Sequence, residues 1–198
     1  MSEIQNLIQN YERHIALPWK AELPGAQKIV FVIYHPQEER NLRGKMRDFE
    51  SSTRLAKHAW HECDMTHFLP KWIDAQHKEQ KALYGDKSTL NYHADFDSLL
   101  IAADEIQEDL CSDLTERLQD TNVTENDVVA VYGVAGLFDI LHTTTVLKKV
   151  EDSIRGRLLL FFPGYYKGGQ YRFMDARDGF NYLGVPITRE ASYMPSYE

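Results

Sequence analysis

Cysteines, basic residues and long apolar runs are all scarce in this chain of 198 residues. The two cysteines, Cys63 and Cys111, lie far apart and outside any Cys-x-x-Cys pair, which argues against a disulfide framework and suits a reducing cytoplasm. No stretch approaches the roughly 18 uncharged apolar residues that a membrane span needs. The first residues lack the basic and apolar regions of a signal peptide. We therefore expect a cytoplasmic protein.

Acidic residues outnumber basic ones, with 30 Asp and Glu against 22 Lys and Arg, so the formal net charge is −8. Such a chain repels a phosphate backbone at long range, and strong direct binding of nucleic acid is not expected. The chain contains no repeat, low-complexity tract or Gly/Ser linker. A single domain over 1–198 is predicted, with 190–198 as a flexible tail.

Apolar periodicity predicts alternating strands and helices. Strands are expected at 28–34, 61–69, 127–132, 157–162 and 182–187, and helices at 3–16, 38–57, 70–84, 95–120 and 137–154. The strands at 28–34, 127–132 and 157–162 are continuous apolar runs, as in parallel strands covered on both faces. This order predicts an α/β fold, a doubly wound, mostly parallel sheet with helices on both faces. It is similar to a P-loop-type or Rossmann-like domain without a phosphate-binding loop.

Ligands of such sheets bind beyond the carboxyl ends of the strands. After the first strand, the Gly44-Lys45 pair is followed by Met46 rather than Ser or Thr, so the phosphate-loop motif is absent. After the third, Gly133 and Gly136 allow a tight turn into Phe138 and Asp139. That turn fits either chain reversal with close packing or a helix N-terminus that holds an anion.

Two other groups of polar side chains are candidate reactive sites. Alternation along the expected strand places four residues on one face: His61, Cys63, Met65 and His67. Three of these four could ligate zinc, and His58 and Asp64 lie nearby in the sequence. The alternative is that these are packed or surface histidines. Asp175 and Asp178 beside Arg172 suit either a two-carboxylate site or hydrogen bonds that tie the last strand to the sheet. No Gly-x-Ser-x-Gly elbow is present, and we expect neither cofactor nor catalytic residue.

Three surfaces suit partner binding. Helix 95–120 carries nine acidic residues and one basic residue, Arg117, which fits a solvated surface or a basic partner. Helix 38–57 holds the main basic concentration, including Arg40 and Arg43. Tyr165 and Tyr166 are candidate interface anchors.

Several blocks of the chain resemble the BrxB family of bacteriophage exclusion (BREX) systems. They are 17–19, 39–43, 49–50, 128–138, 154–164, 171–172 and 175–182. The likeness spans nearly the whole chain, although Val134-Ala135-Gly136 stands where a Gly-Ser-like pair is expected in the family.

The resemblance implies a non-catalytic scaffold or adaptor that binds other BREX proteins. PglZ, the alkaline-phosphatase-like protein of these systems, is the leading candidate. The alternative is a degenerate nucleotide- or nucleic-acid-binding enzyme with a site at the carboxyl ends of the strands.

Overall fold

The computed structural model of the chain describes residues 2–20, 22–84, 96–138, 140–174 and 179–190. The strands are β1 (Ile29–Tyr34), β2 (Ala59–Asp64), β3 (Asp127–Tyr132), β4 (Arg157–Lys167), β5 (Gln170–Phe173) and β6 (Val185–Ile187). The α-helices are α1 (Glu3–Ile15), α2 (Glu39–Arg43), α3 (Met46–Leu55), α4 (Phe68–Tyr84), α5 (Phe96–Ile101), α6 (Ala103–Leu118), α7 (Ala135–Phe138) and α8 (Thr143–Val150). Short 3-10 turns are η1 (Gly25–Lys28), η2 (Pro36–Glu38) and η4 (Glu151–Ser153). Among the described helices, none combines the length and apolar character that crossing a membrane requires.

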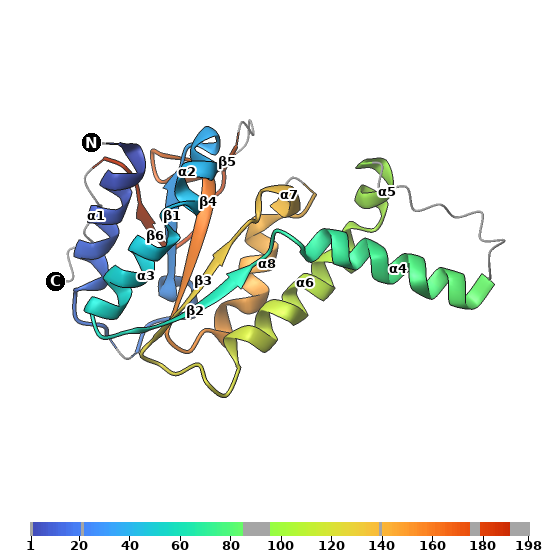
Figure 1. Cartoon of the computed structure of the whole chain (residues 1–198), viewed down its shortest axis with the longest axis horizontal. Helices are drawn as coiled ribbons and strands as arrows, with labels where there is room; N and C mark the ends of the chain where they lie inside the picture. Colours follow the sequence, from blue (N-terminus) through green and yellow to red (C-terminus); the bar gives the residue numbers. More distant parts are fainter. Residues whose placement is uncertain (1, 21, 85–95, 139, 175–178, 191–198) are drawn as a thin grey trace.

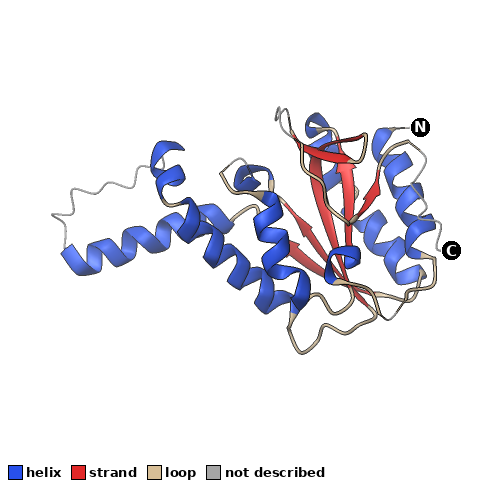
Figure 2. Cartoon of the chain, turned by 180° about the vertical axis from the view of Figure 1, so that it is seen from behind, coloured by secondary structure: helices blue, strands red, loops and turns tan. Residues whose placement is uncertain are grey.

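The sheet is parallel through the order β2-β3-β4-β1-β6, and β5 pairs antiparallel with β4. Helices α1 and α3 pack together on one face, and α6 and α8 pack together on the other (Figure 1). Seen from behind, the strands stand between these two helical layers (Figure 2). The predicted doubly wound α/β fold is confirmed.

Alternating side chains of the central strands enter two separate cores. In β1, Ile29, Phe31 and Ile33 face α6 and α8, whereas Val30, Val32 and Tyr34 face α1 and α3. β3 and β4 alternate in the same way. Two buried faces explain the continuous apolar runs, because every position of β1, of 127–131 in β3 and of 157–164 in β4 is buried.

Three predicted helices are interrupted. The helix expected at 38–57 ends at Arg43 and begins again at Met46, after Gly44 and Lys45. Ala102 separates α5 from α6. The helix expected at 137–154 becomes α7, α8 and η4, because His142 is extended and starts a new helix. The first and third predicted helices, 3–16 and 70–84, are found with small shifts at their ends.

The predicted strands differ from the observed strands mainly at their carboxyl ends. The strand expected at 61–69 is β2, which ends at Asp64, and the last strand is only Val185–Ile187. Pro163 and Gly164 do not end β4, which runs on to Lys167. Pro163 is the last β4 residue paired with β1, and its carbonyl accepts a hydrogen bond from the Met174 N–H (2.9 Å). Proline has no N–H to donate, and Pro163 therefore stands at the position where β4 changes its partner from β1 to β5.

A β-hairpin formed by β4 and β5 was not predicted. Its turn is Gly168-Gly169, with φ of 60° and 81°, in the left-handed region that glycine adopts readily. Beyond it, Tyr171 and Phe180 exchange backbone hydrogen bonds. The hairpin extends past the parallel sheet and forms one wall of the cleft described below.

Candidate functional site

The carboxyl ends of the parallel strands carry two depressions. The first, which we call the Arg43 groove, has a volume of about 340 Å³ and follows β2 and β3. The second, which we call the hairpin cleft, has a volume of about 690 Å³ and follows β1, β4 and β6. Among the described residues, these are the hollows at the sheet edge where ligands of doubly wound folds bind.

The turn between β3 and α7 lies beside the Arg43 groove. Gly133 has φ +77°, and a Cβ there would lie 2.5 Å from Thr66 Oγ1 and 2.7 Å from Thr66 N. Gly133 thus serves chain reversal and close packing. Gly136 is not required for close packing, because a Cβ there would meet nothing within 4 Å. Phe138 is buried and contacts the Phe173 ring edge-on at 5.6 Å, while Asp139 lies outside the described residues.

The Arg43 groove is lined by Arg43, Gly44, Met46, Arg47, Glu62, Asp64 and Tyr132. Arg43 donates to Glu39 (Nε to Oε1, 2.7 Å), and its guanidinium carbon lies 5.9 Å from the centre of the Tyr132 ring. Arg40, on the same helix, is exposed and does not line the groove.

Two ionisable groups of this groove, Asp64 and Tyr132, have shifted pKa values. Burial acts to raise the pKa of Asp64, but hydrogen bonds from Thr66 and the charge of Arg43 outweigh it and lower the pKa. Burial, with Glu62 and Asp64 nearby, raises the pKa of Tyr132 to about 12. At neutral pH the carboxylate is therefore ionised and the phenol is neutral, an arrangement that suits binding better than proton transfer.

The hairpin cleft combines three chain segments. Its lining residues are Glu3, Ile33, His35, Gly164, Tyr165, Tyr166, Lys167, Arg172, Thr188, Arg189 and Glu190. Tyr165 and Arg172 are directly paired across the hairpin, so their side chains share one face, and Lys167 alternates onto it. The opposite face carries Tyr171 and Phe173, which are buried against the sheet.

The far wall of the cleft is held by Glu3 of α1. Its carboxylate accepts from the His35 N–H (2.9 Å) and from Arg189 (Nη1, 3.2 Å). The His35 ring meets the Tyr165 ring edge-on, with centroids 5.7 Å apart. Glu3 and Arg189 thus neutralise each other, while Lys167 and Arg172 form no ion pair within the part of the chain that the structure describes.

The proposed metal ligands are not brought together. Cys63 and Met65 enter the core, His61 Nε2 donates to the Asp127 carboxylate (3.0 Å), His58 contacts Asn126, and His67 is exposed beyond β2. Across the described ranges, no three His, Cys, Asp or Glu side chains are placed to share a metal ion.

Neither thiol is poised to react. Burial raises the pKa of Cys63 to about 12 and also raises that of Cys111, so both remain protonated and unreactive. Asp175 and Asp178 lie outside the described residues.

Sequence reasoning identified Tyr165, Tyr166 and Arg172 but not the cleft that joins them to His35 and Arg189. The Gly168-Gly169 pair between two aromatic segments was the available signal, since it is typical of a two-residue hairpin turn. Nothing in the sequence pairs α1 with the end of β6. No family model, curated protein or solved structure matches this chain.

Proposed function

We propose that this chain is a non-catalytic adaptor of a BREX phage-defence system in the bacterial cytoplasm, and that its partner is PglZ. The resemblance to the BrxB family supplies the system and the partner. The observation that carries the docking role is an arm, formed by α4, α5 and the start of α6, that projects from the sheet (Figure 1). The arm exposes two large apolar side chains.

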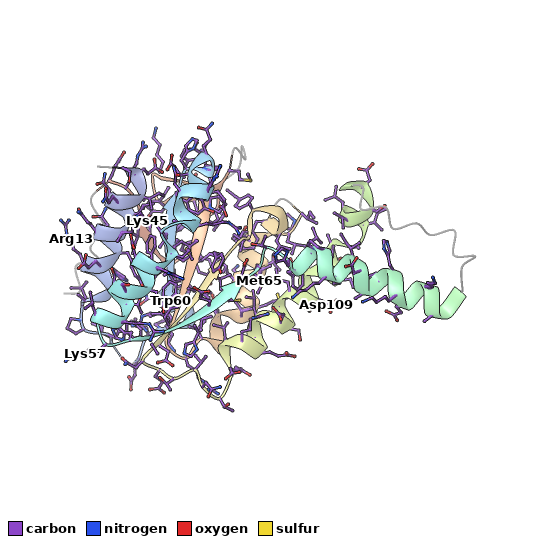
Figure 3. All side chains as sticks on the ribbon, in the orientation of Figure 1. Arg13, Lys45, Lys57, Trp60, Met65 and Asp109 are labelled. Atoms are coloured by element: carbon purple, nitrogen blue, oxygen red, sulfur yellow. The ribbon has the colours of Figure 1, made fainter. Side chains whose placement is uncertain are left out.

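The arm is attached to the body at its base. Trp72 of α4 is buried there, and its Nε1 donates to Asp109 of α6 (2.8 Å; Asp109 is labelled in Figure 3). One turn further on, Gln76 donates to Glu105 (3.4 Å). Beyond Gln76 the described side chains of α4 are exposed. The side chains described in this outer part of α4 thus add little to the core.

The apolar contact surface lies on α5. Leu100 is 45% exposed and Ile101 is 88% exposed, side by side in sequence. Two adjacent exposed aliphatic side chains on a projecting element suit a protein interface. These two residues are the anchors that we assign to the partner.

Acidic side chains follow these anchors along α6. Asp104 and Glu105 are exposed in its first turn, and Glu108 and Glu116 are exposed further along it. Arg117 pairs with Asp113 (2.9 Å) and Lys149 pairs with Glu108, so part of this charge is neutralised within the chain. The surface therefore fits an apolar pocket with a basic rim on PglZ.

Co-purification tests the proposal. The tagged chain is expected to retain PglZ from cells that express the whole BREX system, at mild ionic strength. Replacing Leu100 and Ile101 together by Asp is expected to abolish retention, because two charges would have to be buried in the interface.

Leu55→Asp is the matched control, since Leu55 is 79% exposed on α3, away from the arm. That variant should retain PglZ as the wild type does. Failure of the wild type to retain PglZ would refute the proposed partner. Undiminished retention by the folded Leu100→Asp, Ile101→Asp variant would refute the arm as the docking surface.

A further inference from the structure

The hairpin cleft has the size and position of a small-molecule site. Its volume of about 690 Å³ falls within the roughly 300–1,000 Å³ of ligand pockets. The cleft lies at the carboxyl ends of β1 and β4, which are adjacent in the sheet. The connections that follow these two strands leave in different directions, because β1 leads into α2 and α3 whereas β4 leads into the hairpin. Doubly wound folds bind ligands at such a point.

The charge of the cleft is opposite to that of the chain. The molecule carries −8 overall, yet the cleft gathers three cations and two carboxylates. Glu3 is already engaged by the His35 N–H and by Arg189. Lys167 and Arg172 are exposed and have no carboxylate partner within the described ranges. Two such cations on one strand face are suited to phosphate, which arginine in particular binds through two donors at once.

An aromatic surface stands beside these cations. The Tyr165 side chain is 41% exposed, although it occupies a β-strand, and it shares its face with Arg172. Lys167, two residues further along, lies about 7 Å away by the rise of a strand. A single ligand can therefore place a planar ring on Tyr165 and phosphate oxygens on Lys167 and Arg172.

The two glutamates that follow β1, Glu38 and Glu39, do not repel a phosphate in the cleft. Glu39 accepts from Tyr34 and Arg43, and Glu38 accepts from Asn41 (2.8 Å), so both are engaged on the α2 side and neither lines the cleft.

We propose that the hairpin cleft binds a nucleoside phosphate, with the base on Tyr165 and the phosphates on Lys167 and Arg172. The proposal concerns binding and includes no hydrolysis. It goes beyond the docking role, and because none of the cleft residues belongs to the arm, the two are tested separately.

Calorimetric titration of the full chain with ATP, GTP, CTP and UTP tests the proposal, with adenosine and inorganic triphosphate as the separate halves of the ligand. At least one nucleotide is expected to bind at a single site. The two halves are expected to bind about tenfold more weakly or worse, because each lacks one set of contacts.

Variants locate the site. Lys167→Gln and Arg172→Gln are each expected to weaken nucleotide binding about tenfold, the effect of losing one charge-assisted hydrogen bond. Tyr165→Ser should weaken binding, whereas Tyr165→Phe, which keeps the ring, should not. Lys148→Gln on α8 and Arg13→Gln on α1 are matched exposed controls that should leave binding unchanged.

Three results would overturn the proposal. They are the absence of binding by all four nucleotides, binding that Lys167→Gln and Arg172→Gln leave unchanged, and triphosphate binding as tight as that of the nucleotide. The last would reassign the cleft to a bare anion.

Discussion

At the amino edge of the sheet, three side chains fasten the segment after α1 to the strands. The Trp19 ring stacks on the His58 ring at 3.7 Å, with planes 6° apart, and the Arg157 guanidinium carbon lies 4.5 Å from the centre of the Trp19 ring. Arg157 is buried at the start of β4. The segment 17–19 and the start of β4 thus meet in a packing contact.

Gly133 and Gly136 form a matched pair for mutation. Gly133→Ala is expected to lower the free energy of unfolding by at least about 1–2 kcal/mol, because alanine disfavours a positive φ and its Cβ would clash with Thr66. Gly136→Ala is expected to be neutral or to stabilise by up to about 1 kcal/mol, because it sits in α7 with free space around it. Urea unfolding of both variants checks this; equal destabilisation would contradict it.

At the scale of elements, the apolar runs were sufficient to predict the central strands. β3 was found at its predicted bounds and β1 within one residue, because burial on both faces leaves an unambiguous pattern. The breaks at Gly44, Ala102 and His142 were missed, since helical periodicity continues across each.

The candidate site was predictable only in part. Strand ends identify the edge of the sheet where ligands bind, and Tyr165, Tyr166 and Arg172 stood out as polar and aromatic side chains near it. The other wall of the cleft could not be predicted, because Glu3 and Arg189 are separated by almost the whole chain and no local pattern links them.

Trp72 is expected to control the attachment of the arm. Trp72→Ala removes a buried indole and its hydrogen bond to Asp109, so α4 should detach and become sensitive to proteases. Limited proteolysis followed by mass spectrometry should then find cleavage within 68–84. Trp72→Phe keeps most of the packing and should stay resistant. Equal resistance of Trp72→Ala would show that other contacts hold α4.

At the scale of the whole molecule, the two cores are joined through β1, β3 and β4, each of which contributes to both. Among the described helices, α1 and α3 contribute to one core, and α6 and α8 contribute to the other. A loss of packing on either face therefore acts on the same strands, and we treat the unfolding of the body as one equilibrium.

Acid is expected to lower the free energy of unfolding through His14. Burial, aided by the charge of Arg157, lowers the pKa of His14 to about 4, whereas an unfolded histidine titrates near 6.5. Between these values the unfolded chain binds a proton that the folded chain does not, so stability falls as the pH decreases through this window. Between pH 7 and pH 5 this group should contribute a loss of about 2 kcal/mol.

Urea unfolding at both pH values measures this loss. His14→Gln should remove that part of the pH dependence, whereas His67→Gln, at an exposed position, should keep it. The same slope in His14→Gln as in the wild type would contradict the assignment.

The pairing of β1 with β4 has a consequence for biosynthesis. Ile29 pairs with Leu158, so the first strand leaves the ribosome long before its neighbour has been made. At about 5–20 residues per second, this interval is on the order of ten seconds. Throughout it, the apolar β1 lacks its central partner β4, and for most of it β1 also lacks α6 and α8, the helices that cover one of its faces. Nascent chains of this protein should therefore depend on chaperones that shield β1 until translation is nearly complete.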